Sequence, residues 1–514
     1  MSQQKVSKIG LITCTSNFFT FGLRSIEAHL KNLGHEVLII NCVRKEDNTI
    51  SLLNSFQLKA LAERCFDYGV VGLSIISAHN LKRAEQVNNY MLENTKAKVV
   101  LGGVPVILDP KYFLKFAEFV CLGEGEIFFE KFLQCEDYSA VPGLGYKTEN
   151  REVVLNSLPP LVNVNSLSIP RFDFANTYFL TEETIASLAE DPKPLNASCF
   201  KGYRIFSIRG CSFSCTYCAN NKLKAVYKGL GTIVRPTHPD KVIEELEYAK
   251  EIIPNLSQVH ISDDDFAARP KDEFEYLIAE YQKKINLPCS FFCKWQTFTE
   301  TKLDIILKHK LKVVWLKMGL QSASLRINKS FYNRPFNKKV FIERCRHIVS
   351  NNITLQIDMI FQNPYEGVPD WIENIYFFRE LGQGIAIDRS SPKLIQLGQG
   401  SLRFYPGTEL YDRALNDGII DKDYVNDVLL TRNEYNVSKK SAFAVTMFSI
   451  DIVLLSLYYL LIANKANLLC RIFRKPFVLK LLNWFCSNSL FRFCWSHFRL
   501  HSVLSKAKRL FLRK

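Results

Sequence analysis

Three cysteines stand close together in the segment Arg209-Gly210-Cys211-Ser212-Phe213-Ser214-Cys215-Thr216-Tyr217-Cys218, with the spacing C-x3-C-x2-C. An apolar run over 203–208 predicts a strand that leads into them. Thiolates at this spacing on one short loop can converge on an iron–sulfur cube. Three ligands leave one iron open, and an open position suits catalysis rather than a structural staple. The alternatives are a zinc site and buried thiols that bind nothing.

The motif, with an aromatic residue just before the third cysteine, closely resembles the signature of the radical S-adenosylmethionine (SAM) enzymes. The resemblance implies that Cys211, Cys215 and Cys218 hold a [4Fe–4S] cluster and that Tyr217 lies beside the adenine of SAM. In that family the open iron binds the amine and carboxylate of SAM. Reductive cleavage of SAM then gives a 5′-deoxyadenosyl radical.

Upstream of this motif, residues 8–135 alternate short apolar runs with helical patterns, which predicts a parallel, doubly wound, Rossmann-like α/β domain. Ligands of such sheets lie at the carboxyl ends of the strands. Small residues stand at these ends, where they let a ligand approach the backbone closely: Ser74, Gly102, Gly103 and Gly123.

Taken together, Gly34-His35-Glu36-Val37, Val71-Gly72-Leu73-Ser74, Leu101-Gly102-Gly103 and Gly123-Glu124-Gly125-Glu126 resemble the cobalamin-binding domain found before many radical SAM cores. The Asp-x-His-x-x-Gly motif that usually supplies a lower-axial histidine does not occur, and neither His35 nor His79 fits it. We therefore expect cobalamin to bind without a histidine ligand from this chain. The alternative is a vestigial domain that no longer holds the corrinoid.

The sequence divides into four regions: a cobalamin-binding domain over 1–136, a linker over 137–200, a radical SAM barrel over 201–425 and a C-terminal region over 426–514. The linker is rich in proline and includes a possible small hairpin of 145–147 with 153–155. Beyond it the βα alternation resumes, with strands expected at 204–208, 257–262, 289–294, 313–319, 354–361 and 394–405. Six such units fit the partial (β/α)6 barrel that the resemblance implies.

Polar residues mark the ends of the predicted barrel strands. The sequence Gly319-Leu320-Gln321-Ser322 resembles the family's Gly-x-Glu-Ser contact to SAM, with Gln321 in place of the acid. Asp263-Asp264-Asp265 is either a solvated turn or a source of carboxylates facing SAM or substrate. Asp358 falls within the fifth strand. Arg235 fits the subfamily's usual arginine, or lies on the surface.

Fifteen cysteines without a secretory signal peptide favour a reducing compartment, and hence a cytoplasmic protein. The core cysteines outside the motif, Cys199, Cys289, Cys293 and Cys345, are scattered and are expected to be buried thiols. The net charge of +15 belongs mostly to the C-terminal region, because no acidic residue follows Asp451 while Lys and Arg recur to the end.

The C-terminal region is expected to be helical, basic and apolar. Ala442 to Ala463 is a long apolar run whose only charge is Asp451. Later residues mix Leu, Phe and Trp with Arg and Lys, as do helices that lie in a membrane interface. The three interpretations are peripheral membrane contact on the inner face of the membrane, a true membrane span, and a basic helical domain folded on the barrel. We expect no nucleic-acid partner.

The resemblance implies a cobalamin-dependent radical SAM enzyme that transfers a methyl group to an unactivated carbon or, less often, phosphorus centre. Its partners would be a small-molecule or lipid-like substrate and a reducing electron donor such as flavodoxin or ferredoxin. The alternatives are a radical SAM enzyme that forms a ring or rearranges a bond without net methylation, and a non-catalytic iron–sulfur scaffold at a membrane. Specific catalytic side chains are not identified by the sequence.

Overall fold

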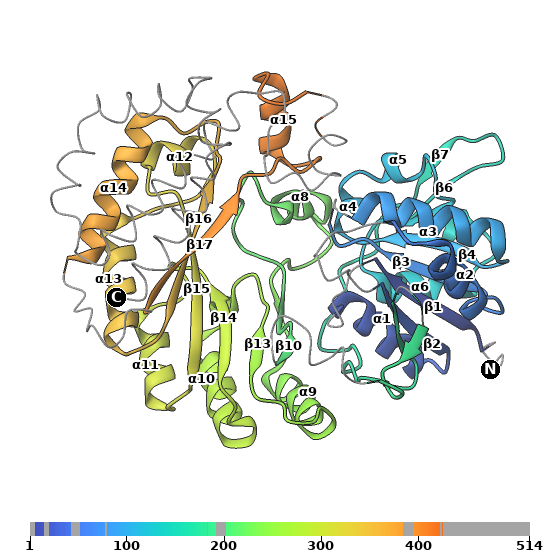
Figure 1. Cartoon of the computed structure of the whole chain (residues 1–514), viewed down its shortest axis with the longest axis horizontal. Helices are drawn as coiled ribbons and strands as arrows, with labels where there is room; N and C mark the ends of the chain where they lie inside the picture. Colours follow the sequence, from blue (N-terminus) through green and yellow to red (C-terminus); the bar gives the residue numbers. More distant parts are fainter. Residues whose placement is uncertain are drawn as a thin grey trace.

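The computed structural model describes residues 6–14, 20–42, 52–77, 80–181, 183, 185–191, 202–383, 394–421 and 424. These residues form two α/β units, the N-terminal one in blue to teal-green and the second in green to orange (Figure 1). The C-terminal region 426–514 lies outside the described residues, as do Cys199 and His79. Within the described ranges, no helix is long and apolar enough to cross a membrane.

The first unit is built on one mixed sheet with the strand order β7-β6-β5-β4-β3-β1-β2-β8-β9. Its strands are β1 (Lys8–Thr13), β2 (Glu36–Cys42), β3 (Val70–Ser74), β4 (Lys98–Gly102), β5 (Phe119–Cys121), β6 (Leu144–Lys147), β7 (Val153–Leu155), β8 (Thr177–Leu180) and β9 (Ile185–Ser187). Strands β1 to β5 and β8 run parallel, whereas β6, β7 and β9 are antiparallel to their neighbours.

Helices cover both faces of this sheet. The helices of the unit are α1 (Phe21–Asn32), α2 (Ser55–Arg64), α3 (Leu81–Asn94), α4 (Val104–Leu108), α5 (Pro110–Phe113) and α6 (Gly125–Gln134). Leu23, Ile26 and Leu30 recur at helical spacing on α1 and pack with α6 against one face, because burying this apolar stripe removes it from water. Helices α2 and α3 bury Leu61 and Val87 on the other face. The predicted doubly wound fold is confirmed.

The segment predicted as a linker, 137–200, extends the first sheet at both edges. The expected hairpin forms as β6 and β7, but it pairs with β5 instead of bridging the two units. Strands β8 and β9 add to the opposite edge, where β8 pairs with β2. The segment is therefore part of the first sheet and not only a connection.

The second unit is a sheet of parallel strands in the order β10-β13-β14-β15-β16-β17. Its strands are β10 (Tyr203–Ile205), β13 (Val259–Ile261), β14 (Cys289–Cys293), β15 (Val313–Gln321), β16 (Leu355–Phe361) and β17 (Ile395–Ser401). In the described part of the chain no pairing closes β17 onto β10. The sheet is thus an open barrel, and the predicted partial (β/α)6 architecture is confirmed.

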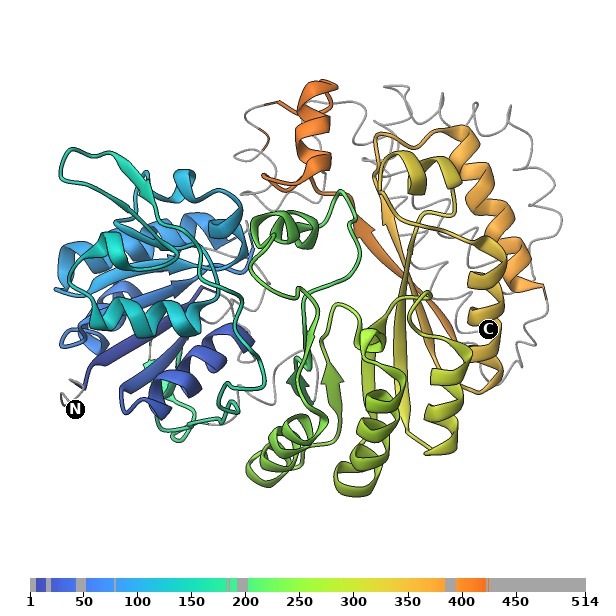
Figure 2. The same cartoon turned by 180° about the vertical axis from the view of Figure 1, so that it is seen from behind.

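The connecting helices of the barrel lie on its outer face, which the view from behind also shows (Figures 1 and 2). They are α9 (Pro239–Ile252), α10 (Lys271–Glu280), α11 (Glu300–Lys308), α13 (Lys338–Ser350) and α14 (Val368–Gly382). Helix α9 illustrates their origin: proline stands in its first turn, Asp240 follows, and Val242, Leu246 and Ala249 form the buried stripe. The βα alternation of the sequence predicted helices between the barrel strands.

Shorter elements, most of which the sequence patterns did not predict, gather around the upper end of the barrel. They are β11 (Ile208–Arg209), α8 (Ala219–Val226), β12 (Arg235–Pro236), α12 (Leu325–Ser330) and α15 (Glu409–Asn416). In Figure 1, α8 lies between the two units and α15 lies above it. These elements, with the strand ends, surround the three-cysteine loop.

Candidate functional site

The three-cysteine loop begins where β11 ends. Strand β11 pairs antiparallel with β12, with Arg209 opposite Arg235. Gly210 follows with φ of +85°, in the left-handed region that glycine tolerates. A Cβ at this position would collide with the Ile233 carbonyl, so only glycine lets the chain turn here toward Cys211.

The cysteines of this loop face one another closely enough to interact. Cys211 and Cys215 are buried, while Cys218 is half-buried, precedes α8 and donates its N–H to the Cys215 carbonyl at 3.0 Å. Burial, together with the neighbouring Asp264, Cys215 and Cys211, raises the pKa of the Cys218 thiol to about 11. Three thiols therefore share one small region of low dielectric constant.

The arrangement fits an iron–sulfur cube better than a single ion. Across the described residues, no three Cys, His, Asp or Glu side chains are placed to hold one metal ion. A closed zinc site needs four such ligands around one point. In a cube each cysteine binds a different iron, so the thiols need to surround an object and not a point. Cys289, Cys293 and Cys345 lie buried in the barrel core, as expected, and offer no fourth ligand.

Segments from distant parts of the barrel hold the loop in place. The Thr216 N–H donates to the Tyr332 carbonyl at 3.1 Å, and the Thr216 carbonyl accepts from the Leu410 N–H of α15 at 3.1 Å. Tyr217 packs edge-on against Tyr332, with ring centroids 4.9 Å apart. The loop is consequently anchored after β15 and after β17, and Tyr217 stays beside the cysteines.

Arg334 links the loop to the predicted SAM-binding strand end. It is 4% exposed, its Nη1 lies 3.6 Å from the Cys215 sulfur, and its Nη2 donates to the Gly319 carbonyl at 2.6 Å. Sequence reasoning missed this residue, because nothing in its local pattern indicates a partner 119 residues away. Arg334 places the carboxyl end of β15 next to the cluster loop.

The residues predicted to contact SAM, Gly319, Gln321 and Ser322, lie at the end of β15 but do not all face the cluster loop. Gln321 has φ of +69°, and a Cβ on Gly319 would lie 2.5 Å from the Gln321 side-chain amide, so that amide lies directly over the glycine. Ser322, by contrast, is fully buried, and its carbonyl accepts from Asn328 at 2.5 Å. Gly319 and Gln321 border the loop through Arg334, whereas Ser322 faces the interior of the protein.

The three acidic residues after β13, Asp263 to Asp265, have different surroundings. They do not form a solvated turn, so that interpretation of the sequence was wrong. Asp263 is fully buried and accepts from Ser207 N–H, Ser207 Oγ and Ile208 N–H at 2.6, 2.6 and 2.9 Å. Burial raises its pKa to about 7. Asp265 accepts from Thr297 Oγ1 at 2.8 Å. These two carboxylates support loops, and Asp264 and Asp265 both lie near enough to Cys211 for their negative charges to add to burial in raising the pKa of its thiol.

The four small residues predicted to admit a corrinoid line one cavity of about 700 Å³ between the units. Ser74, Gly102, Gly103 and Gly123 stand on it together with Cys211 of the cluster loop. Gly103 has φ of +115°, and a Cβ there would collide with the Ile75 carbonyl, so the chain must carry glycine at this turn. The cavity brings the carboxyl edge of the first sheet and the cluster loop to one space.

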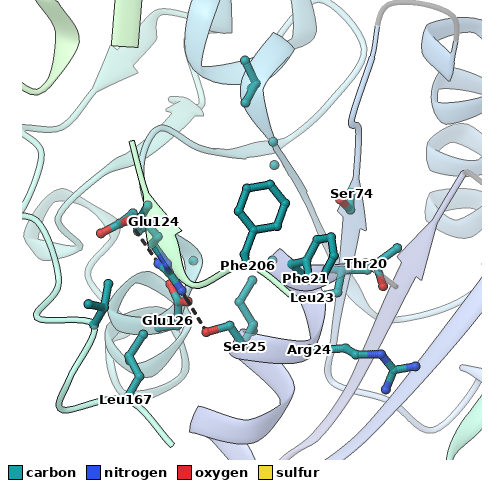
Figure 3. A pocket seen from close by; sticks show the side chains of 18 of the residues that line it. Thr20, Phe21, Leu23, Arg24, Ser25, Ser74, Glu124, Glu126, Leu167 and Phe206 are labelled. Carbon is teal, nitrogen blue, oxygen red and sulfur yellow. Dashed lines mark hydrogen bonds and ion pairs between the residues drawn. The ribbon is translucent and has the colours of Figure 1, made fainter. Parts of the chain in front are cut away.

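Apolar side chains form much of the cavity wall. Figure 3 shows Phe21 and Phe206 side by side near Ser74, and their rings meet at 4.6 Å between centroids. No histidine stands among the described residues that line the cavity. His35 follows the end of α1, is buried, and accepts from the Ser7 N–H at 3.2 Å. The lining suits a large, flat, apolar cofactor.

Two arginines flanking the cluster loop pair with carboxylates of the first unit. Glu124 Oε1 lies 3.0 Å from Arg209 Nη1 and 2.7 Å from Arg235 Nη2, and Arg209 Nη2 lies 2.5 Å from Glu126 Oε1. Burial acts to raise the pKa of Glu124, but the hydrogen bond from Arg235 and both positive charges hold it below its usual value. Arg235 therefore lies in a buried interface and not on the surface. Sequence reasoning missed the roles of Glu124 and Glu126.

Two family models match the chain. Residues 205–374 match the radical SAM superfamily and residues 7–133 match the B12 binding domain, so together the models cover more than half of the sequence. A comparison with curated proteins gave no match.

Solved structures with the same two-unit organisation are similar in fold. TsrM from Kitasatospora setae, described as a radical SAM methyltransferase with cobalamin and a [4Fe–4S] cluster bound, has a TM-score of 0.62 and 14% identity over 80% of this chain and 78% of TsrM. OxsB, described as a cobalamin-dependent SAM radical enzyme with aqua-cobalamin and SAM bound, has a TM-score of 0.65 and 14% identity over 97% of this chain and 76% of OxsB.

Proposed function

Because the chain belongs to the radical SAM enzymes that carry a B12-binding domain, we propose that it is a cobalamin-dependent methyltransferase acting on an unactivated carbon or, less often, phosphorus centre. The cofactors of these domains are a [4Fe–4S] cluster, SAM and cobalamin. One observation carries the proposal: a single cavity of about 700 Å³ touches both the cluster loop at Cys211 and the strand ends at Ser74, Gly102, Gly103 and Gly123. Two cofactors can thus face one substrate.

When bound, the cofactors supply a 5′-deoxyadenosyl radical and a transferable methyl group. The protein holds and orients them. Cys211, Cys215 and Cys218 would hold the cluster, and Arg334, through its contact with the Cys215 sulfur, would orient that ligand. The glycine turn at Gly103 would let a corrinoid lie against the backbone.

The protein also has to hold the two cofactors in fixed positions relative to each other and to exclude water from the site. The ion pairs of Glu124 with Arg209 and Arg235 join the edge of the first sheet to the strands beside the cluster loop. Phe21 and Phe206 cover the adjoining wall with apolar surface. A dry site protects a reactive radical from quenching and strengthens every polar contact within it.

The methyltransferase assignment can be tested without knowing the substrate. The full-length chain is reconstituted anaerobically with iron, sulfide and cobalamin, reduced, and given SAM with a CD3-labelled methyl group. We expect 5′-deoxyadenosine, S-adenosylhomocysteine, and the CD3 label on the corrinoid by mass spectrometry. A chain that forms 5′-deoxyadenosine but never labels the corrinoid would instead catalyse cyclisation or rearrangement. A chain that forms neither product would be a scaffold.

We also propose two partners that the sequence suggests. One is a one-electron donor of the flavodoxin or ferredoxin type, since reductive cleavage of SAM requires an electron. The other is an anionic membrane surface contacted through the basic and apolar region 426–514, where each cation near the surface contributes about 1 kcal/mol. Sedimentation with anionic vesicles tests the second, because a chain truncated after Lys440 should remain in the supernatant.

A further inference from the structure

The inner face of the barrel is polar and only partly filled. Strand β16 alternates fully buried residues with half-buried ones, and the half-buried set includes Gln356 and Asp358. On neighbouring strands Lys317 is half-buried and Gln396 is exposed. The buried set packs against the outer helices. Parallel strands with both faces covered are almost continuously apolar, and a closed barrel is filled by side chains. A polar, accessible inner face therefore indicates a hollow that takes a ligand.

An ion pair occupies the middle of this face. Lys317 on β15 and Asp358 on β16 lie 2.9 Å apart, with side chains 27% and 28% exposed. On the next strand, Gly398 lies opposite Asp358, and a Cβ there would collide with the Asp358 carboxylate. Glycine weakens a strand interior and often marks close approach of another group. Gly398 thus makes the space in which this carboxylate sits.

Three rings form a wall beside the ion pair. The rings of His260, Phe292 and Trp315 lie with centroids 5.0 to 5.8 Å apart. The Lys317 ammonium lies 5.3 Å from the centre of Phe292. Burial, with the charges of Arg204 and Lys317, lowers the pKa of His260 to about 4, so this ring is neutral at physiological pH. The wall is therefore aromatic and uncharged.

The wall and the ion pair both adjoin the cofactor sites. Phe292 lines the same cavity as Cys211 and Ser74. Asp358 is paired in register with Gly319, whose carbonyl is bound by the arginine that reaches Cys215. A ligand that lies on Phe292 with its edge at Lys317 therefore borders the cavity lined by the cluster loop and by the strand ends of the first sheet.

We propose that Lys317 and Asp358 bind the polar edge of the substrate while Phe292 and Trp315 bind its flat face. The substrate is then a planar, unsaturated ring compound that presents a hydrogen-bond acceptor beside a donor, as an aromatic carboxamide does. The acceptor receives a hydrogen bond from the Lys317 ammonium and the donor gives one to the Asp358 carboxylate. This inference rests on the proposed function, since it places the substrate of that reaction in the barrel.

A hydrocarbon chain is a poor occupant of the same space. It would cover the Lys317 ammonium and the Asp358 carboxylate without offering either a hydrogen bond, and loss of hydration without compensation is costly. A ring with a polar edge satisfies both charges and adds an offset or edge-on contact with Phe292 and Trp315. The barrel thus selects a heteroatom-bearing ring over a lipid tail.

Binding of simple probes tests this selection. Saturation-transfer NMR titrations on the reconstituted full-length chain compare benzamide with ethylbenzene (ring without edge), cyclohexanecarboxamide (edge without flat ring) and octanoate (a lipid-like chain). We expect benzamide to bind most tightly. Lys317→Met should weaken benzamide binding about tenfold, because a hydrogen bond to a charged group is lost. Lys317→Arg, which keeps the charge, should retain most of the binding and shows whether loss in the methionine variant reflects misfolding.

A matched ion pair on the outer helices provides the control. Lys338 and Glu380 lie 2.7 Å apart on α13 and α14, so Lys338→Met should leave benzamide binding unchanged. Octanoate binding more tightly than benzamide, or equal benzamide affinity in wild type and Lys317→Met, would overturn the inference. Formation of 5′-deoxyadenosine by the wild-type chain is measured in parallel. If no 5′-deoxyadenosine forms but benzamide binding still depends on Lys317, the proposed function is refuted. The inferred binding site would still be supported.

Discussion

Glu124 and Arg235 are 111 residues apart in sequence, yet the carboxylate accepts hydrogen bonds from both terminal guanidinium nitrogens, at 2.7 and 2.8 Å. Glu124 directly follows Gly123 at the proposed corrinoid edge, and Arg235 lies opposite Arg209 on the strand pair that leads to Cys211. The side chains are 17% and 14% exposed. This ion pair therefore connects the proposed corrinoid site on the first sheet to the strands beside the cluster loop, in an interface largely shielded from water.

We predict that Glu124→Gln weakens this tie. Two arginines would lose their shared anion, which costs about 3 kcal/mol in a mostly buried setting. Cleavage of SAM, which does not need the corrinoid, should persist, while CD3 labelling of the corrinoid should fall. Glu130→Gln is the control, since Glu130 pairs with His29 inside the first unit at 3.2 Å. Equal labelling by both variants would contradict a coupling role for Glu124.

The cluster assignment predicts a sharp contrast among cysteines. Replacing Cys211, Cys215 or Cys218 with alanine should abolish both iron loading and 5′-deoxyadenosine formation, because a cube lacking one of three protein ligands is poorly held. Cys345→Ala removes a thiol from the barrel core, so it should lower stability but keep the iron. Iron content after anaerobic reconstitution decides the matter, and an iron-free Cys345→Ala chain would show that the ligand set is wrong.

The corrinoid site predicts that bulk at the strand ends displaces cobalamin. Ser74→Trp or Gly102→Trp fills part of the cavity, and overpacking of this kind should lower cobalamin affinity about tenfold or more. The cluster spectrum should not change, and Val153→Trp on the exposed hairpin should bind cobalamin normally.

The histidine-free lining predicts a second property of the same site. Electron paramagnetic resonance of the reduced corrinoid should show no nitrogen coupling from a protein histidine, because no histidine stands among the described lining residues. A histidine coupling would disprove ligand-free binding, while leaving the cavity assignment intact.

Asp263 predicts a pH dependence of stability. Its pKa is about 7 in the folded chain and about 4 when unfolded, so between these values the folded state holds a proton that the unfolded state has lost. This contribution is complete below pH 4 and disappears as the pH rises through 7, amounting to at most about 4 kcal/mol. Asp263→Asn cannot titrate, so urea unfolding of the cluster-free variant should lose less stability from pH 5 to pH 8. Parallel pH profiles would disprove this.

Sequence patterns predicted the parts of the fold that repeat locally. Apolar runs and helical stripes located the barrel strands and the helices around them, since burial imposes those periods on each element by itself. The three-cysteine motif could be recognised for the same reason, because all three cysteines lie within one loop. A glycine turn at a strand end, such as that at Gly103, can likewise be predicted from a few neighbouring residues.

Contacts between distant segments were not predictable in this way. Asp263 satisfies backbone N–H groups 55 and 56 residues away, so nothing beside it distinguishes it from a solvated acid. Strands β8 and β9 are short, and β8 joins the sheet by pairing with β2, which is distant in sequence. Their proline-rich surroundings favoured a linker. Arg334 and Glu124 acquire their roles only when the fold brings their partners to them.

The placement of β8 beside β2 has a consequence for synthesis and for dissection of the chain. A fragment ending at residue 136 would lack both outer hairpins, leaving β2 and β5 as bare edges open to pairing with other chains. On the ribosome, the N-terminal half likewise cannot complete its sheet until Ser187 has emerged, well after α6 has been made. For that interval β2 remains an unpaired edge of the sheet.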